Sequence, residues 1–466
     1  MATLLFHGAA QTVTGSCVEM DWAGRRILLD CGLFQGRREE ASGRNQRFSF
    51  DAGSVDAVVL SHAHLDHSGR LPALVRNGFR GPVYATLATR DLCDMLLRDS
   101  ARLQIRDAES RNATCVQLGI SPSFEPLYDE GDVERAMTLF RVLEYAETVP
   151  LAPGLNLTLN DAGHVLGSAT ICLDYSRDGK PRRLLFTGDV GQGGMPLLRD
   201  PVPVSDVAVL ITESTYADRC HPVEKNINAQ LLEHLSYVAR NQSKLVIPAF
   251  SVGRTQQLLL HFSEIFKDNV APDIPVYVDS PMARAATQAY EIHRRFLNSE
   301  TQARMAKGDN PFTFPNLSYT SKMGESRRIQ VDPGPMVIIS ASGMCAGGRV
   351  MRHIRDVIAD PVNIVLMVEF QAKGTLGRCI AEGRDIVQIR GKNNALKAKI
   401  HFIDTLSGHA DSQGLRAFFG KLGNNIQTAF CVHGEPASCR ANAKILTSLG
   451  VPQTHVPVPG QQFENV

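Results

Sequence analysis

The chain of 466 residues is long enough for two or three domains, each with its own hydrophobic core. Its 49 Lys and Arg residues nearly balance its 48 Asp and Glu residues, so the formal net charge is +1. This balance excludes a protein whose whole surface is strongly basic. Any polyanion would have to be held by a local basic patch.

The ten cysteines include no Cys-x-x-Cys pair, and several lie in apolar runs, such as Cys172 and Cys431. This usage indicates buried free thiols in a reducing compartment, rather than disulfides or a thiolate metal site. The first residues show no basic segment followed by a long apolar run, so no signal peptide is expected. No stretch approaches about 18 uninterrupted apolar residues. We therefore expect a soluble, cytoplasmic protein without a membrane partner.

In chain order, the first half reads as short strands with two long helices between them. Apolar runs and turn residues predict strands over 3–7, 16–20, 25–30, 55–60, 81–85, 155–159, 169–174, 183–186 and 206–211. Helical periodicity predicts helices over 87–111 and 132–143.

The stretch 61–67, Ser-His-Ala-His-Leu-Asp-His, carries four metal-competent side chains at the end of a predicted strand. His62 and His64 are two residues apart on extended backbone, so they point to the same side. Asp66 and His67 follow at a turn, which allows one loop to supply two adjacent metal ions. Imidazole and carboxylate ligands without a thiolate suit Zn²⁺ that keeps one position open for water.

His164 and Asp189 also follow predicted strands and lie in Gly-rich turns. If these strand ends meet along one sheet edge, both residues join the ligands of the 61–67 loop in one pocket. The result is a ligand set for two metal ions, with Asp189 as the bridge because a carboxylate offers two oxygens. Asp30, at the end of another strand, is either a turn former or the hydrogen-bond partner that fixes a ligand histidine's tautomer. Beside the His-rich loop we favour the second interpretation.

After residue 223 the pattern changes to alternating helices and apolar strands. We expect helices near 223–241, 254–267 and 349–358, with strands over 244–249, 276–279, 336–340 and 363–368. This alternation indicates a separate α/β domain with a mostly parallel sheet. Strands followed by histidines then return, over 399–404 before His409 and over 428–432 before His433. We therefore expect one domain in two parts, 1–216 and 399–466, with the α/β domain inserted at 217–398.

The order His62-x-His64-x-Asp66-His67, then His164, then Asp189, resembles the metallo-β-lactamase superfamily. This resemblance implies an αββα sandwich and a dinuclear zinc hydrolase. The later motifs narrow the resemblance to the β-CASP nucleases, the branch that includes the endonuclease of mRNA 3′-end processing and its prokaryotic relatives. These motifs are Thr-Glu-Ser-Thr-Tyr at 212–216, the inserted domain, Ser-Gly-His-Ala-Asp at 407–411 and Val-His-Gly-Glu at 432–435.

The resemblance spans nearly the whole chain and implies a role for each motif residue. It implies that His62, His64 and His164 hold one zinc, that Asp66, His67 and His433 hold a second, and that Asp189 bridges them. Four residues then count as catalytic: Asp66, Asp189, His409 and Glu213. His409 is the general acid or transition-state stabiliser, and Glu213 orients it and raises its pKa. A metal-bound hydroxide would hydrolyse RNA in a cleft between the two domains.

Two Gly-rich turns of the inserted domain are candidate phosphate contacts. Ser251 and Arg254 lie in one, and Ser342 and Gly343 in the other, where predicted strands pass into helices. Backbone N–H groups at such helix starts bind phosphates, and Arg254 could add a bidentate contact. Ordinary turns whose glycines meet backbone constraints account for the same residues equally well.

Two other functions remain in competition with an RNA hydrolase. One is hydrolysis of a small ester or thioester, which the inserted domain and the Glu213/His409 pair disfavour. The other is a non-catalytic RNA-binding subunit, which the full set of metal ligands disfavours. RNA is the expected partner, and the sequence leaves a homodimer, the RNA sequence preference and the cleavage mode open.

Overall fold

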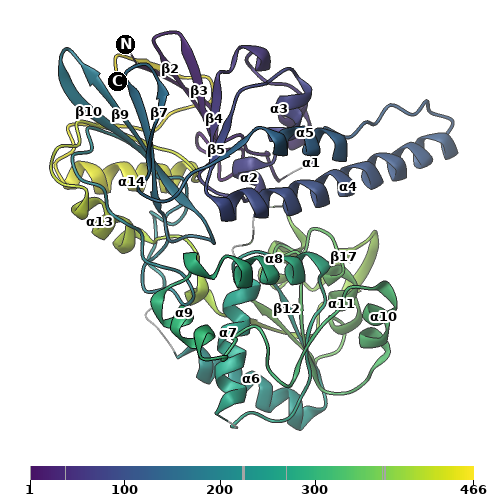
Figure 1. Ribbon diagram of the computed structural model, residues 1–466. Helices are drawn as coiled ribbons and strands as arrows, with labels where there is room; N and C mark the ends of the chain where they lie inside the picture. Colours follow the sequence, from purple (N-terminus) through teal and green to yellow (C-terminus); the bar gives the residue numbers. More distant parts are fainter. Residues whose placement is uncertain (1, 37, 223–225, 269, 370, 372–373) are drawn as a thin grey trace. The chain divides into compact units, whose positions relative to one another are not determined.

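A computed structural model describes residues 2–36, 38–222, 226–268, 270–369, 371 and 374–466 of the chain (Figure 1). The chain divides into two compact units. The first comprises Met1–Gly193, Asp200–Cys220 and His409–Val466, and the second comprises Gly194–Arg199 and His221–Gly408. The helix expected from residue 223 begins in 223–225, which lie outside the described residues.

The first unit contains two seven-stranded sheets. One has the order β22-β1-β2-β3-β4-β5-β6, with β1 (Ala2–Gly8), β2 (Cys17–Trp22), β3 (Arg25–Leu29), β4 (Ala57–Val59), β5 (Val83–Ala85), β6 (Phe140–Val142) and β22 (Gln462–Glu464). The other has the order β21-β20-β11-β10-β9-β8-β7, with β7 (Thr148–Ala152), β8 (Leu155–Asp161), β9 (Ala169–Arg177), β10 (Lys180–Phe186), β11 (Val209–Thr212), β20 (Thr428–Cys431) and β21 (Gln453–His455).

A shared apolar core lies between the two sheets. It joins Leu4 and Val59 of the first sheet to Leu157, Ile171 and Phe430 of the second. Strand β8 shows the cause in its sequence, since its leucines alternate with Asn and Thr and only the leucines are fully buried. Alternation along the strands therefore supplies the inner face of each sheet, and the two inner faces pack together.

Helices complete the sandwich on its outer sides (Figure 1). The first part of the chain contributes α1 (Arg38–Gln46), α2 (Leu65–Ser68), α3 (Leu71–Arg76), α4 (Leu87–Gln117) and α5 (Glu130–Thr138), and the last part contributes α13 (Ser412–Lys421) and α14 (Pro436–Ser448). Leu415 and Phe419 of α13 and Leu446 of α14 pack with Leu185 and Ala429 of the second sheet. The expected αββα sandwich is confirmed.

The helix expected over 132–143 is correct only in its first half. Helix α5 begins after Asp129, whose side chain accepts from the Asp132 N–H, and it ends at Thr138. The next residues form β6, which pairs in parallel with β5. Phe140 and Leu143 bury their side chains at 7% and 5% exposure. Sheet pairing, which local periodicity does not reveal, therefore overrides helical continuation.

The second unit is an α/β domain on a six-stranded sheet of order β14-β13-β15-β12-β16-β19. Its strands are β12 (Lys244–Pro248), β13 (Val276–Val278), β14 (Leu317–Tyr319), β15 (Met336–Ser340), β16 (Ile364–Met367) and β19 (Lys399–Phe402), with a separate hairpin β17 (Ile386–Ile389) and β18 (Lys392–Ala395). Every pairing described within the six-stranded sheet is parallel. Its helices are α6 (Ile227–Asn241), α7 (Arg254–Lys267), α8 (Pro281–Ile292), α9 (Ser299–Ala306), α10 (Met323–Val331), α11 (Val350–Val357) and α12 (Leu376–Ala381).

Strand β19 belongs to the second unit, whereas the sequence predicts that the first domain resumes at residue 399. The strand pairs in parallel with β16 and so completes the second unit's sheet. The chain returns to the first unit at His409. All ten cysteines are free, and seven of them are buried, as expected. Among the described residues, none of the helices has the length and apolar character needed to cross a membrane.

Candidate metal centre

The ends of neighbouring strands bring the candidate ligands together in the first unit. Asp30 follows β3, the 61–67 loop follows β4, and β3 and β4 are parallel. In the second sheet, Asp189 follows β10 and His433 follows β20, with the parallel strand β11 between them. The carboxyl ends of parallel strands meet at one edge of a sheet, which explains how residues so distant in sequence become neighbours.

The first candidate ligand group consists of His62, His64, His164 and Asp189. His64 Nδ1 lies 3.1 Å from His62 Nε2 and 3.2 Å from His164 Nε2. Asp189 Oδ2 lies 3.6 Å from His62 Nε2 and 3.5 Å from His164 Nε2. Four ligand atoms therefore converge on one point.

The second candidate group consists of Asp66, His67 and His433. His433 Nε2 lies 3.1 Å from His67 Nε2 and 3.6 Å from Asp66 Oδ2. Asp189 Oδ2 is also 3.3 Å from His67 Nε2, and Asp189 Oδ1 is 3.3 Å from His433 Nδ1. Asp189 thus contacts members of both groups.

The donor set fits metal ions. Ligands about 2.0–2.1 Å from a tetrahedral zinc lie about 3.3 Å from one another, close to the separations in both groups. The ring nitrogens of neutral histidines that face each other at this distance repel through their lone pairs unless a proton or a cation lies between them. The spacing of the seven residues is therefore compatible with two groups of metal ligands.

Hydrogen bonds on the other ring nitrogen orient three of the histidines. His67 Nδ1 donates to Asp30 Oδ2 at 2.7 Å, and His62 Nδ1 lies 3.1 Å from Ser61 Oγ. His433 Nδ1 lies 3.2 Å from Thr215 Oγ1. With a proton held on Nδ1, each ring presents the Nε2 lone pair to the ligand group.

Asp30 accepts several of the hydrogen bonds that surround the candidate ligands. It is fully buried and accepts hydrogen bonds from Ser16 Oγ at 3.0 Å, Ser61 N at 2.8 Å and Ser61 Oγ at 2.9 Å, besides the one from His67. The sequence pointed to Asp30, but it did not single out Ser16, Ser61 or Thr215. The signal for Ser61 was its place directly before His62, where a short hydroxyl side chain can reach both neighbours.

Burial and neighbouring charges shift the pKa values of the candidate ligands in both directions. Burial lowers the pKa values of His62 and His64, which keeps their lone pairs available. Burial has the same effect on His67, but the charges of Asp189 and Asp30 outweigh it and raise the pKa of His67 well above its usual value. Burial opposes the charge of Asp66, but the neighbouring His433 and His67 outweigh it and lower the pKa of Asp66 to about 2. Burial likewise opposes the charge of Asp189, whereas His433 and His67 hold the pKa of Asp189 well below its usual value.

His409 and Glu213 form a pair beside these ligands. His409 Nδ1 lies 3.0 Å from Glu213 Oε2 and 3.9 Å from Asp189 Oδ2, and its ring centroid is 4.6 Å from that of His164. Burial opposes protonation of His409, but the charges of Glu213 and Asp189 outweigh it and raise the pKa of His409 to about 9. A protonated imidazole therefore lies next to the ligand groups without belonging to them.

Glu213 is itself within metal-binding distance of Asp189 and His433. However, its Oε1 accepts from the Val190 N–H at 2.6 Å, and both of its oxygens lie within 3.2 Å of His409 Nδ1. A carboxylate engaged on both oxygens is a poor additional ligand. Glu213 therefore suits the orienting role better.

The candidate phosphate contacts lie in the second unit, after β12 and β15. Ser251 is in the turn before α7, and Arg254 begins that helix. Arg254 is only 8% exposed, its Nε lies 3.3 Å from Glu369 Oε1, and its Nη1 donates to Gln257 Oε1 at 2.8 Å. Ser342 Oγ accepts from the Ala346 N–H at 3.0 Å in the turn that contains Gly343.

Known sequences match the chain over most of its length. A model described as a metallo-beta-lactamase superfamily domain matches residues 17–180, a Beta-Casp domain matches 255–380, and a Zn-dependent metallo-hydrolase RNA specificity domain matches 395–457. Ribonuclease TTHA0252 of Thermus thermophilus is 37% identical, with 95% of each chain covered. The chain belongs to the β-CASP ribonuclease family.

Other members of the β-CASP family agree with this assignment. Transcription termination factor FttA of Methanocaldococcus jannaschii is 31% identical over 97% of this chain and 70% of its own length. An RNase J-like protein of the same organism is 32% identical over 99% of both chains. A solved structure from Enterococcus faecalis V583, of unknown function, has a TM-score of 0.55 at 13% identity over 99% of both chains, which supports the fold alone. The chain is accordingly a metallo-hydrolase of this family.

Proposed function

We propose that this β-CASP protein is a zinc-dependent ribonuclease that uses two zinc ions per chain. The observation that carries the proposal is the His409–Glu213 pair beside two converging ligand groups that share Asp189. This arrangement supplies the parts that hydrolysis of a phosphodiester requires, namely charge neutralisation, a nucleophile and a proton for the leaving oxygen. The names of the relatives, Ribonuclease TTHA0252 and RNase J-like protein, favour RNA as the substrate.

Each ligand group would hold one zinc ion. His62, His64 and His164 would bind the first and Asp66, His67 and His433 the second, with one Asp189 carboxylate shared between them. When bound, two zinc ions supply Lewis acidity for the phosphate and a source of hydroxide near neutral pH. Asp30, Ser61 and Thr215 keep the ligand rings oriented toward this centre.

His409 then acts as the general acid or as a stabiliser of the transition state. Its Nδ1–H donates to Glu213, so its Nε2 is the atom that can carry the transferable proton. With a pKa raised to about 9, the ring is protonated at neutral pH and can donate to the departing alkoxide. Glu213 fixes the orientation and charge of the ring.

We further propose that the turns containing Ser251, Ser342 and Gly343 contact phosphates of the substrate. Backbone N–H groups and a serine hydroxyl suit this role. Arg254 contributes less directly, because a phosphate would have to compete with Glu369 for the buried guanidinium. The free cysteines favour a reducing compartment, which supports a cytoplasmic site of action.

A substrate comparison tests the function. The metal-loaded protein should cleave a 5′-labelled single-stranded RNA, with little turnover of chromogenic esters and thioesters. A His409→Ala variant in the same assay controls for contaminating ribonucleases, because its cleavage should fall by about 10²–10⁴-fold. Efficient ester hydrolysis without RNA cleavage would overturn the proposal in favour of a small-ester hydrolase. Zinc-loaded protein inactive on all substrates would favour a non-catalytic subunit.

A further inference from the structure

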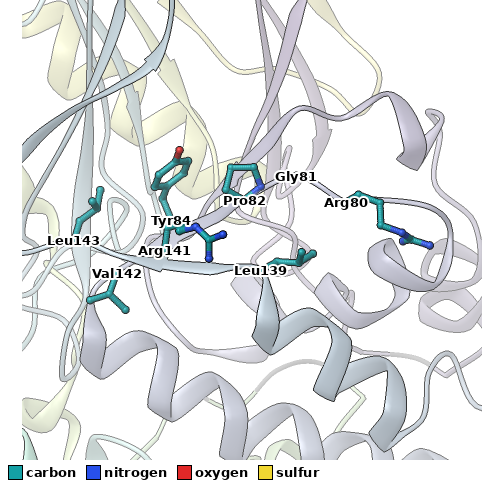
Figure 2. Close-up of a pocket in the computed structure, with 8 residues that line it drawn as sticks. All are labelled: Arg80, Gly81, Pro82, Tyr84, Leu139, Arg141, Val142 and Leu143. Atoms are coloured by element: carbon teal, nitrogen blue, oxygen red, sulfur yellow. The ribbon is translucent and has the colours of Figure 1, made fainter.

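A pocket apart from the candidate metal centre lies in the first unit along the edge strand β6 (Figure 2). Its volume is about 490 Å³, and it is formed by β5, β6 and the turn that precedes β5. The residues that matter for its chemistry are Arg80, Pro82, Tyr84, Leu139, Arg141 and Leu143. The size is that of a small-ligand pocket.

Part of the pocket wall faces the core between the two sheets. Tyr84 of β5 is the register partner of Arg141 of β6, so the two side chains share a face. Leu143, which follows β6, belongs to the core between the sheets, and Tyr84 packs against that core. Arg141 is nevertheless exposed, so a charged side chain occupies a core-facing position at the sandwich edge.

The two arginines have no acidic partner among the described residues. Arg80 Nη1 donates to the carbonyls of Val75 at 2.8 Å and Phe79 at 2.7 Å, and Arg141 Nη1 donates to the carbonyl of Phe140 at 3.1 Å. No Asp or Glu is among the residues that line the pocket. Two cationic groups therefore border a partly apolar surface with their charges uncompensated.

Two carboxylates of adjoining segments bind other arginines. Asp132 of α5 lies 3.7 Å from Arg76 Nη1 and 2.5 Å from Arg135 Nη2. Asp56, whose carbonyl lies close to Gly81 in the pocket wall, accepts from Arg25 Nη1 at 2.7 Å. Neither of these two carboxylates forms a described ion pair with Arg80 or Arg141.

We propose that this pocket binds single-stranded RNA outside the metal centre. A base would lie against Tyr84 and Pro82, and the phosphates on either side of that nucleotide would contact Arg141 and Arg80. Figure 2 shows Arg141 beside Tyr84, with Arg80 on the far side of Pro82. An aromatic ring flanked by basic groups is the usual arrangement for sequence-tolerant binding of single strands. The choice of RNA rests on the proposed function.

Protection of the sheet edge accounts for only part of this arrangement. An inward-pointing charge on an edge strand blocks pairing with another strand, and Arg141 can serve that purpose alone. Edge protection gives no reason for Arg80, which precedes β5, or for the half-buried Tyr84 ring in the pocket wall. A nucleotide explains the two arginines and the ring together.

The pocket is also separable from catalysis. The candidate ligands of the 61–67 loop and Asp30 follow the carboxyl ends of β4 and β3, and Asp189 and His433 follow β10 and β20 of the other sheet. Arg80, Pro82 and Leu139 instead precede the parallel strands β5 and β6. Substitution of Arg80 and Arg141 should therefore leave the metal content and the chemical step unchanged.

The test is binding of a fluorescein-labelled single-stranded RNA to the full-length protein in a His409→Ala background, which prevents cleavage. The Arg80→Ala/Arg141→Ala protein should lose about two phosphate contacts. The slope of log K against log salt should fall by about 1.4 in magnitude, which corresponds to about 25-fold weaker binding at 0.1 M salt. Arg182→Ala, a charge removal at the start of β10 in the same unit, should have little effect. Tyr84→Leu should weaken binding without changing the slope.

Separate readouts distinguish failure of this proposal from failure of the proposed function. In the otherwise wild-type protein, Arg80→Ala/Arg141→Ala should cleave a dinucleotide phosphodiester at an unchanged rate. A salt slope equal to that of the Arg182→Ala control, or preferential binding of an acidic peptide, would overturn the RNA pocket. So would a parallel loss of dinucleotide cleavage. If wild-type protein cleaves no RNA, the proposed function fails, while the binding measurement still decides whether the pocket holds RNA.

Discussion

His409 Nδ1 lies 3.0 Å from Glu213 Oε2, while Glu213 Oε1 is fixed by the Val190 N–H at 2.6 Å. The backbone N–H directly after Asp189 therefore positions Glu213, and Glu213 in turn positions His409. Because Glu213 is 1% exposed, its charge acts on the ring with little screening by solvent. This chain of contacts connects His409 to the backbone beside Asp189.

The roles of two histidines can be separated by metal analysis. His409→Ala should leave the zinc content near that of the wild type and lower the rate of RNA cleavage by about 10²–10⁴-fold, because a proton donor is lost without loss of a ligand. His433→Ala should lose zinc as well as activity. Both variants should be measured by elemental analysis and by cleavage of labelled RNA. Equal zinc loss in the two would mean that His409 is a ligand.

The pH profile should report the Glu213 charge. This charge helps to raise the pKa of His409, so Glu213→Gln should lower that pKa. In this variant His409 should lose its proton at a lower pH than in the wild type. The alkaline limb of the kcat/KM profile should therefore move to lower pH. An alkaline limb that stays in place, or moves upward, would contradict the general-acid role.

Ser61 should matter more for metal affinity than its neighbour Ser16. Ser61 Oγ lies 3.1 Å from His62 Nδ1 and donates to Asp30, the partner of His67, so one hydroxyl supports rings in both ligand groups. Ser61→Ala should weaken zinc binding by about 10–100-fold, the usual effect of losing such a support. Ser16→Ala, which removes only a bond to Asp30, is the matched control. Competition with a chromogenic chelator measures both, and identical affinities would exclude the special role of Ser61.

Much of the architecture followed from the sequence because the motifs sit where periodic strands end. The alternating leucines of β8 and the apolar run of β4 predict these strands. The polar side chains that follow the strands form one site only if the ends of the strands meet at one edge of each sheet. The second half of the 132–143 segment and the place of β19 were missed. In both cases the structure depends on pairing with a strand that is distant in sequence. The local hydrophobic pattern does not predict such pairing.

The outer layer of the metal centre was harder to foresee. Asp30 and His433 adopt positive φ angles of 64° and 49°, a region unfavourable for residues with a side chain. Gly188 has a φ of 53°, and a Cβ there would lie 2.5 Å from the Ser61 Cβ. Such close approaches arise from the packing of two sheets. The sequence shows Gly188, but it does not predict that the Ser61 side chain lies beside it.

Zinc titration of metal-free protein, followed by cleavage of a 5′-labelled RNA, tests the central claim most directly. Seven converging ligands exceed what one tetrahedral zinc can use, so activity should rise until two equivalents are bound per chain. Asp189→Asn should bind less zinc and lose hydrolysis, because the shared ligand loses its charge. Full RNA cleavage with one zinc or none per chain would contradict the dinuclear account.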